Sequence, residues 1–513
     1  MGKALVYTLI MYLIAGSWSG CAPGGNKSPS DRPFRLALDQ VPQTLNPRHA
    51  LDAAGQRLGA LIFRGLVRTD SELKPLPDLA EKWRVEAGGR IWRFWVRSGL
   101  KDHALRPIDA PRLALCLERY RKGTPLSEVG VAIPFWKSAS AQGDQVILEL
   151  EKANPYLIRD VALLRYFTLE DGEPCQDPKP GQPVVGSGTF KPARWESSPQ
   201  SEILLLPLQT GQRSALITFV KDETSRTMRL LKGDVDAIQN ALSPTKVRWF
   251  EQEHPRDFRV LSRPGVSVSY LAFNLKHPIL AKKKVRQAIA SAIARDEIIG
   301  LKYRGSLSPA ASLLAPFLLE SFQPALPPFN VERAEQLLEE AGYPRDQEGI
   351  RIRLRYKTTP SHEGMEAALI FQAMLKKAGI ELTLDAVEPA VFLTSVRQRA
   401  FQLYSSRWVG VSDGSILYRT LHTGQRDNRA QYESPAMDAL LDEAMAESDD
   451  LRRIPVMKKI QALMAEDLPY LPLWYWTTDV VVRREAGTNW DARKLSASAA
   501  LEPIIALGTL ETQ

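Results

Sequence analysis

The stretch Tyr270-Leu-Ala-Phe-Asn-Leu-Lys-His-Pro278, with Val285-Arg-Gln-Ala-Ile-Ala-Ser-Ala-Ile-Ala-Arg-Asp-Glu-Ile-Ile-Gly300 close behind it, is the most informative part of this chain. The first segment is typical of a buried strand that breaks at the proline. In the second segment, Val285, Ile289, Ala292 and Ile293 fall on one face at the helical period, and Gly300 predicts the helix end. A strand–loop–helix unit of this kind is common and by itself indicates no function.

Length and composition limit the classes of protein to which this chain can belong. The chain has 513 residues, of which 44% are hydrophobic and 25% are charged. This is enough for a large core and too long for one core of ordinary size. No run of about 18 apolar residues follows the N-terminal region, so the sequence predicts no membrane span in the body of the chain.

The charge balance argues against a nucleic-acid partner. The formal net charge is +8 and the sequence pI is about 9.2. Lys and Arg are spread along the chain, and short clusters such as Lys282-Lys283-Lys284 are the densest. A nucleic-acid-binding protein usually concentrates its basic residues in one stripe, whereas a modest basic excess is typical of a solvated surface.

The N-terminus is typical of an export signal. Lys3 precedes an apolar run from Ala4 to Ala15, and small residues then lead to Cys21. The run is too short for a stable membrane span. Small residues before a cysteine resemble a bacterial lipobox, which predicts lipidation of Cys21; Trp18 departs from that pattern. The alternative is an ordinary secretory signal cleaved nearby. Residues 21–30 are polar and rich in Pro and Gly, as expected of a tether.

The other two cysteines are Cys116 and Cys175. Their spacing is not that of a zinc or iron–sulfur site, and the sequence predicts no metal and no cofactor. In an oxidising compartment the two thiols either pair or remain separately buried. The sequence leaves both alternatives open.

Further along the chain, short strands and helices alternate. Val41-Pro-Gln-Thr-Leu-Asn-Pro47 predicts a turn, and Leu230-Leu-Lys-Gly-Asp-Val-Asp236 predicts a helix end at Gly233 followed by a strand. The expected strands are 34–38, 91–96 and 380–387. The expected helices are 58–66, 111–121, 371–378, 436–447 and 454–466.

Taken in order, these motifs resemble the extracytoplasmic solute-binding proteins of ABC importers, in the class of dipeptide-, oligopeptide- and nickel-binding proteins (family 5). The resemblance rests on the two quoted segments, on Val41–Pro47, Pro75–Trp83, Val185–Lys191 and Leu230–Asp236, and it covers roughly residues 34 to 490. It implies a two-lobed α/β fold of the type II periplasmic-binding class, with an extra subdomain and a ligand cleft between the lobes. It also implies a monomer that docks on an ABC permease.

From this resemblance we expect a signal peptide over 1–20 and a tether over 21–30. Domain I is expected to be discontinuous, with a first part over 31–267 that contains an inserted subdomain at about 56–180, and a return over 482–513. Domain II is expected over 268–481. The chain then crosses twice between the lobes, which predicts a hinge that closes on a ligand.

The sequence offers no recognisable catalytic motif. Its six His form no His-Glu-x-x-His pattern, and no Gly-x-Ser-x-Gly elbow occurs. Carboxylates are plentiful, but no pair stands out as an acid and a base. We therefore expect a binding protein and not an enzyme.

The segment Tyr404-Ser-Ser-Arg-Trp408-Val-Gly-Val-Ser-Asp413-Gly is the expected ligand-binding segment. In peptide-binding relatives, a Trp at this place is followed three residues later by an Asp that receives the amine of the peptide. Here that third residue is Val411. Asp413 matches a second, structural Asp of the relatives, so the amine-binding carboxylate is expected to be lost unless Asp413 substitutes for it.

The predicted ligand-binding residues are Trp408, Val409, Gly410, Asp413, Tyr270 and Tyr475. Core roles for Trp408, Tyr270 and Tyr475, and a turn role for Asp413, are the alternatives. The expected function is capture of a small solute, possibly a peptide, for ABC import by a lipid-anchored protein. The alternative is a non-transport lipoprotein that uses the same fold for sensing or for chaperone-like binding.

Overall fold

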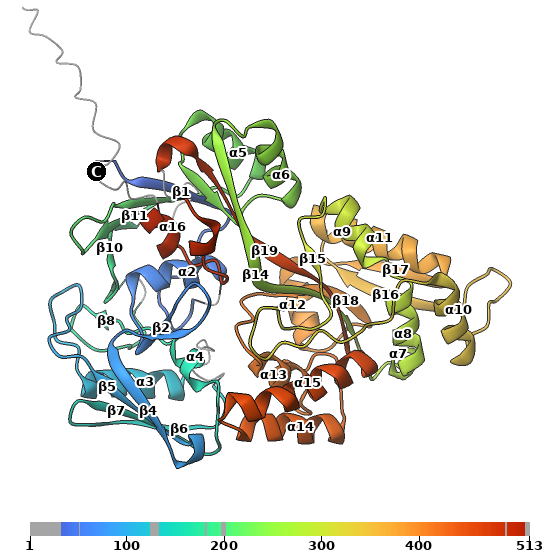
Figure 1. The fold of residues 1–513 in the computed structure, drawn as a ribbon, viewed down its shortest axis with the longest axis horizontal. Helices are drawn as coiled ribbons and strands as arrows, with labels where there is room; N and C mark the ends of the chain where they lie inside the picture. The colour runs from blue at the N-terminus through green and yellow to red at the C-terminus, as the bar shows by residue number, and fades with distance from the viewer. Residues whose placement is uncertain are drawn as a thin grey trace, which may run out of the picture.

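A computed structural model of the chain describes residues 32–50, 52–123, 133–179, 182–195, 202–487 and 490–507 (Figure 1). The expected signal peptide, the tether and Cys21 lie outside the described residues. Among the helices that are described, none combines the length and the apolar character needed to cross a bilayer.

One mixed sheet runs through the whole molecule. Its strand order is β10-β11-β12-β1-β13-β19-β14-β18-β16-β17, and β15 pairs with β19 outside this path. The two central strands are long: β14 spans Phe258–Phe273 and β19 spans Tyr470–Arg483. They pair antiparallel along their length and pass from one half of the molecule into the other (Figure 1).

The pairing of β14 with β19 shifts register between Pro264 and Val268. Before this shift the strands pair with lobe I, since Ala237–Gln239 of β13 lies against β19. After it, β14 pairs with β18 of lobe II. We call residues 32–264 and 477–507 lobe I, and residues 268–475 lobe II. The expected boundaries at 268 and 482 fall within these two strands, and that division of the chain stays a prediction.

Lobe I carries a subdomain built on a separate four-stranded sheet, β4-β5-β7-β6, with α3 packed beside it. Aliphatic and aromatic side chains of this sheet share one core with the main sheet of lobe I. A disulfide between Cys116 on α3 and Cys175 closes the subdomain, with the Cα atoms 4.9 Å apart. Of the two alternatives for these thiols, the structure contains the paired one.

The quoted stretch forms the centre of lobe II, with one correction. Tyr270–Phe273 ends β14 as predicted, but the single helix expected over 285–300 is wrong. The structure has α8 (Lys283–Ser291) and α9 (Arg295–Lys302), and Gly300 lies inside α9. The backbone leaves the helical region at Ala294, with ψ at 78°. The Arg295 guanidinium then bonds to the carbonyls of Ala310 and Pro472, which fixes α9 in its new direction.

Other predicted elements are confirmed with small shifts: β1, β5 and β17 match, the helix predicted over 58–66 is α2 at Ala53–Ile62, and Gly233 ends α5 in the left-handed conformation, with φ at 79°. The remaining elements of lobe I are β1 (Phe34–Leu38), β2 (Val67–Thr69), β3 (Pro75–Pro77), β4 (Ala80–Glu86), β5 (Ile91–Val96), α3 (Ala110–Lys122), β6 (Trp136–Gln142), β7 (Gln145–Leu150), α4 (Leu157–Val161), β8 (Thr168–Leu169), β9 (Val184–Val185), β10 (Phe190–Trp195), β11 (Glu202–Pro207), β12 (Ala215–Phe219), α5 (Glu223–Lys232), β13 (Ala237–Gln239), α6 (Pro244–Glu253) and α16 (Glu502–Leu507). Those of lobe II are α7 (Pro278–Ala281), β15 (Ser308–Pro309), α10 (Val331–Glu340), β16 (Ile352–Thr358), α11 (His362–Lys377), β17 (Ile380–Ala386), α12 (Pro389–Arg397), β18 (Leu403–Trp408), α13 (Ser415–Leu421), α14 (Pro435–Ala446) and α15 (Asp450–Asp467).

Candidate functional site

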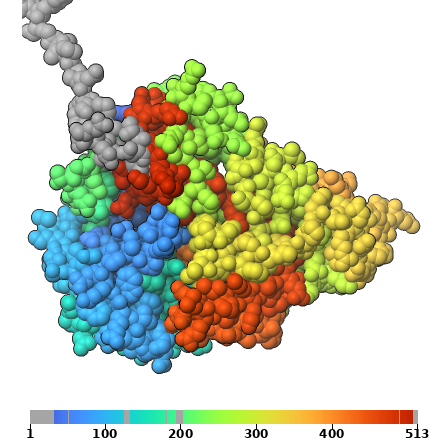
Figure 2. Space-filling view, in the orientation of Figure 1, coloured from blue at the N-terminus to red at the C-terminus, as the bar shows by residue number. Residues whose placement is uncertain are grey.

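The two lobes meet along a seam that includes the predicted binding segment. In Figure 2 the blue subdomain of lobe I abuts the yellow and orange segments of lobe II. After β18 ends at Trp408, the chain turns toward lobe I, and the Val411 N–H donates to the Val266 carbonyl at 2.9 Å. Val266 in turn packs with Leu73 and Ala497 of lobe I. Residues 408–414 therefore lie at the boundary between the lobes.

Trp408 and Tyr270 come together as a stacked pair, with ring centroids 5.6 Å apart and planes 15° apart. The Arg429 guanidinium lies over the Trp408 ring at 4.5 Å. The Trp408 indole nitrogen is buried and has no hydrogen-bond partner in the described part of the chain. Tyr270 is fully buried and its hydroxyl lies 3.2 Å from that of Tyr404, so it supports Trp408 from the interior of lobe II.

Val409 and Gly410 present their backbone to the surface. The Val409 side chain is 67% exposed, and Gly410 has φ of +72° with open space where a Cβ would point. Within the described residues their backbone groups form no hydrogen bond. Such an unpaired stretch at the end of a strand can bind an extended ligand through its main chain.

Asp413 and Tyr475 are already committed to local contacts. One Asp413 oxygen accepts the Ser415 N–H at 2.9 Å, the other lies 3.2 Å from the Ser412 hydroxyl, and the Arg159 Nε of lobe I is 4.0 Å away. The Tyr475 hydroxyl lies 2.8 Å from the carbonyls of Ser312 and Leu314. Both contacts suit the structural alternatives, and ligand binding by either residue stays a prediction.

A buried ion pair at the seam was not predicted. Tyr156, at the start of α4 in lobe I, reaches into lobe II and its hydroxyl lies 3.1 Å from both Glu320 oxygens. The Arg453 Nε donates to Glu320 at 2.6 Å and the Gly414 N–H donates at 2.9 Å. A Cβ on Gly414 would lie 2.5 Å from a Glu320 oxygen and 2.6 Å from the Tyr156 hydroxyl, so the packing around this carboxylate favours glycine there.

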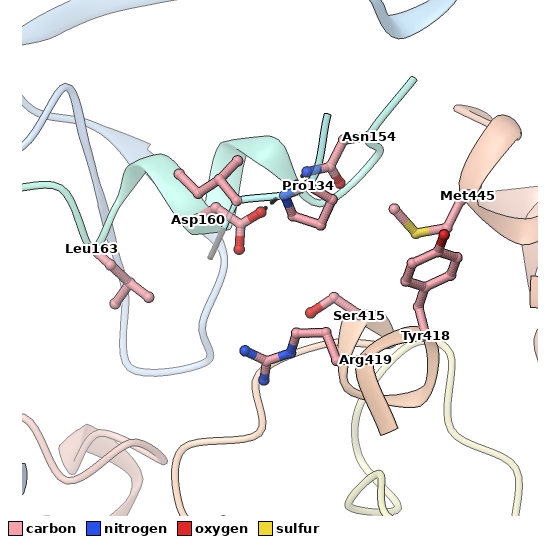
Figure 3. Close-up of a pocket in the computed structure, with 9 residues that line it drawn as sticks. Pro134, Asn154, Asp160, Leu163, Ser415, Tyr418, Arg419 and Met445 are labelled. Carbon is pink, nitrogen blue, oxygen red and sulfur yellow. Dashed lines mark hydrogen bonds between the residues drawn. The ribbon is translucent and has the colours of Figure 1, made fainter. Parts of the chain in front are cut away.

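Beside this pair the seam encloses a cavity of about 70 Å³ (Figure 3). Asn154, Asp160 and Leu163 of lobe I line one side, and Tyr418 and Arg419 of lobe II line the other. Figure 3 shows the Asp160 carboxyl group and the Arg419 guanidinium facing the same space. Burial, and then the charge of Asp413, raise the pKa of Asp160 to about 7, against the opposing effects of Asn154, Arg419 and Arg159.

Charged groups of both signs lie at a second part of the seam. Arg407 stacks on Trp476 with its guanidinium 3.5 Å from the ring centroid, and its side chain remains 38% exposed. Burial lowers the pKa of Arg407, and the opposing effects of Glu363 and Tyr303 of lobe II and of Asp39 of lobe I only partly offset it. In lobe I, the Asp39 carboxylate raises the pKa of Arg57, although burial lowers that pKa overall. The Arg57 Nη1 is buried and has no hydrogen-bond partner in the described chain.

Comparison with known proteins identifies this architecture. The sequence profile of the bacterial extracellular solute-binding proteins, family 5 (middle region), matches residues 74–428. The chain belongs to this family.

Two curated relatives cover nearly the whole family 5 chain. It is 23% identical over 510 residues to the probable deoxycholate-binding periplasmic protein YgiS of Escherichia coli, covering 92% of this chain and 93% of the relative. It is 22% identical over 514 residues to the oligopeptide-binding protein OppA of Bacillus subtilis, covering 92% and 93%. Both relatives are binding proteins by name, not enzymes.

Solved structures show the same two-lobed fold. The Bacillus subtilis oligopeptide-binding protein AppA, in complex with a nonapeptide, superposes with a TM-score of 0.75 at 20% identity and covers 92% of this chain and 98% of its own. NikA of Brucella suis, in complex with Fe(III)-EDTA, superposes with a TM-score of 0.79 at 20% identity, covering 92% and 99%. At these identities the likeness establishes the fold.

The sequence of this family 5 protein did not predict three clusters of residues: Tyr156 with Glu320 and Arg453, the lining of the Asp160 cavity, and Asp39 with Arg57. Their members are far apart in the chain, so no local spacing reveals them. Arg407 had a signal, because it directly precedes Trp408 in the predicted segment.

We expect closure of the lobes of this family 5 protein to depend on pH through Asp160. When the lobes part, water reaches Asp160 and its pKa falls toward the ordinary value of about 4. Since the contact raises the pKa to about 7, the contribution of Asp160 to closure is fully present below about pH 4 and is lost as pH rises through 7. Small-angle scattering should give a smaller radius of gyration at pH 5 than at pH 8.

Asp160→Asn should remove most of this pH dependence, because an amide does not titrate. Asp346→Asn, at an exposed carboxylate of lobe II far along the chain, serves as the matched control and should keep it. An unchanged pH dependence in Asp160→Asn would contradict the assignment to this residue.

Proposed function

We propose that this chain is the extracytoplasmic capture protein of an ABC importer and binds a small solute such as a peptide between its lobes without catalysing a reaction. Family membership supports the transport role, and relatives named for peptide binding support the ligand class. The proposal includes docking of a monomer on a permease and lipid attachment at Cys21, in keeping with the small residues before that cysteine.

The proposed ligand is neutral or anionic, and one observation carries this choice. Carboxylates beside the predicted binding segment are already occupied: Asp413 by Ser415 and Glu320 by Arg453. Arg407 and Arg429 lie over the rings of Trp476 and Trp408. Each also faces a carboxylate of its own, Glu363 at 3.5 Å and Asp427 at 3.9 Å, so these carboxylates are occupied as well. A free ammonium enclosed here would lack a carboxylate partner, and an unpaired buried charge costs several kcal/mol.

We therefore expect di- and tripeptides with a free amine to bind weakly or not at all, and N-acetylated peptides to bind at least as well. Calorimetry with a peptide library, with and without acetylation, measures this directly. Micromolar binding of free-amine peptides that acetylation abolishes would overturn the ligand assignment. If Asp413→Asn also abolished that binding, Asp413 would be the amine partner.

The close packing at Tyr156 favours one alternative, a non-transport lipoprotein that uses the fold for sensing or for chaperone-like binding. Native mass spectrometry of the protein purified from its own host separates the two functions. A small molecule that copurifies at one per chain supports capture for import, whereas heterogeneous unfolded chains in its place support the alternative.

A further inference from the structure

A cationic face of lobe II lies outside the seam. On β16, the side chains of Ile352, Leu354 and Tyr356 are buried against the helices of lobe II. Since successive side chains of a strand alternate between the two faces of the sheet, Arg353, Arg355 and Lys357 lie on the opposite face. Three cations therefore follow one another along one face of the strand.

Pairing with β17 neutralises two of these three cations. The parallel register sets Arg353 beside Glu381 and Lys357 beside Asp385, and their ion pairs measure 2.9 and 2.7 Å. The same register sets Arg355 beside Thr383. As a result, the Arg355 guanidinium forms no ion pair or hydrogen bond with any residue that the structure describes.

A second unpaired arginine faces the same space. Asn274 donates to the carbonyls of Arg399, at 3.2 Å, and of Phe401, at 2.8 Å, and so fixes the loop that follows α12. The Arg399 Nε is buried and has no partner among the described residues. Arg355, Lys357, Asp385 and Arg399 line one cavity of about 340 Å³.

The charges in this cavity indicate which ligands it can bind. Asp385 neutralises Lys357, which leaves the two guanidinium groups with a combined charge of two. Guanidinium binds oxyanions in a two-pronged geometry, and a phosphate monoester carries a charge of about −1.5 to −2 at neutral pH. The helix dipole of α12 favours a cation such as Arg399 at its C-terminal end, but it explains neither the unpaired Arg355 nor the cavity.

We propose that this cavity is an oxyanion site that binds a phosphate group, either as the free ion or on a phosphorylated lipid headgroup. The site shares no residue with the seam between the lobes, so it acts independently of solute capture. Arg355 and Arg399 hold the oxygens, and Asn274 positions Arg399.

Two measurements test the site and distinguish free phosphate from a lipid headgroup as its ligand. Inorganic phosphate is titrated calorimetrically at low ionic strength, and flotation is measured with phosphatidylcholine vesicles with and without phosphatidic acid, whose headgroup is a phosphate monoester. The chain carries Cys21→Ser so that no acyl group contributes. Thr383→Glu supplies the missing carboxylate beside Arg355, and Arg355→Gln with Arg399→Gln removes both guanidinium groups. Each variant should weaken binding by about tenfold or more, because charge-assisted hydrogen bonds are lost.

Arg353→Gln is the matched control, since this arginine lies two residues away on the same face and already pairs with Glu381. It should leave binding unchanged. Saturable phosphate binding identifies the free ion as a ligand, and binding of phosphatidic acid vesicles alone identifies the headgroup. Absence of both, or equal loss in Arg353→Gln and Thr383→Glu, would overturn the proposal.

Discussion

Glu320→Ala is expected to lower the free energy of unfolding by about 3–5 kcal/mol, because it breaks a buried ion pair. The Arg453 Nε, the Tyr156 hydroxyl and the Gly414 amide all lose their acceptor, and among the described residues only Nη2 of Arg453 keeps a carboxylate partner, Asp450. Glu320 is 4% exposed and Arg453 is 2% exposed. Burial lowers the pKa of Arg453, but the combined effects of Glu320, Tyr156 and Asp450 outweigh burial and raise the pKa above its ordinary value.

Urea unfolding measures the loss, with Glu363→Ala as the control at an exposed carboxylate. The double variant Glu320→Ala with Arg453→Ala should lose less than the sum of the single variants, since both single changes break the same ion pair. Additive losses would contradict coupling of the two residues. Tyr156→Phe removes only the bond between lobes, and should enlarge the radius of gyration with little change in unfolding.

Removal of the disulfide is the second large effect that we expect. Cys116 and Cys175 are 59 residues apart in sequence, and both are buried. A crosslink that closes a loop of this length restricts the unfolded chain by on the order of 4 kcal/mol in the chain-entropy estimate. Cys116→Ala with Cys175→Ala should therefore lower the melting temperature by several degrees.

The measurement is thermal unfolding with and without dithiothreitol, in a Cys21→Ser background so that no third thiol exchanges. Reductant should lower the melting temperature of the parent and leave that of the double alanine variant unchanged. Equal melting temperatures of parent and variant under oxidising conditions would show that the bond contributes nothing to stability.

Local patterns were sufficient for the elements of the fold that depend on neighbours in sequence. The strand through Tyr270 and the turn at Gly233 follow from alternation and from left-handed glycine, and both are confirmed. The helix over 285–300 failed because the interruption at Ala294 depends on distant groups: Arg295 bonds to Ala310 and Pro472. Nothing in the helical periodicity contains that information.

The candidate site divides in the same way. Trp408, Val409 and Gly410 stand in one segment, which the resemblance placed near a cleft and which the structure places at the seam. The partners of Glu320 come from α4 and α15, more than 100 residues away on either side, so only the assembled lobes bring them together. The roles of Trp408, Val409 and Gly410 in ligand binding stay a prediction.

The two long strands β14 and β19 have a consequence for cooperativity. Part of each strand lies in the lobe I part of the main sheet, and the rest lies in the lobe II part of the same sheet. Unfolding of the sheet in one lobe therefore also destabilises the parts of β14 and β19 that pair in the other lobe, because the same strands continue through both. Amide protons on both sides of the register shift between Pro264 and Val268 should therefore exchange with solvent through one shared opening reaction.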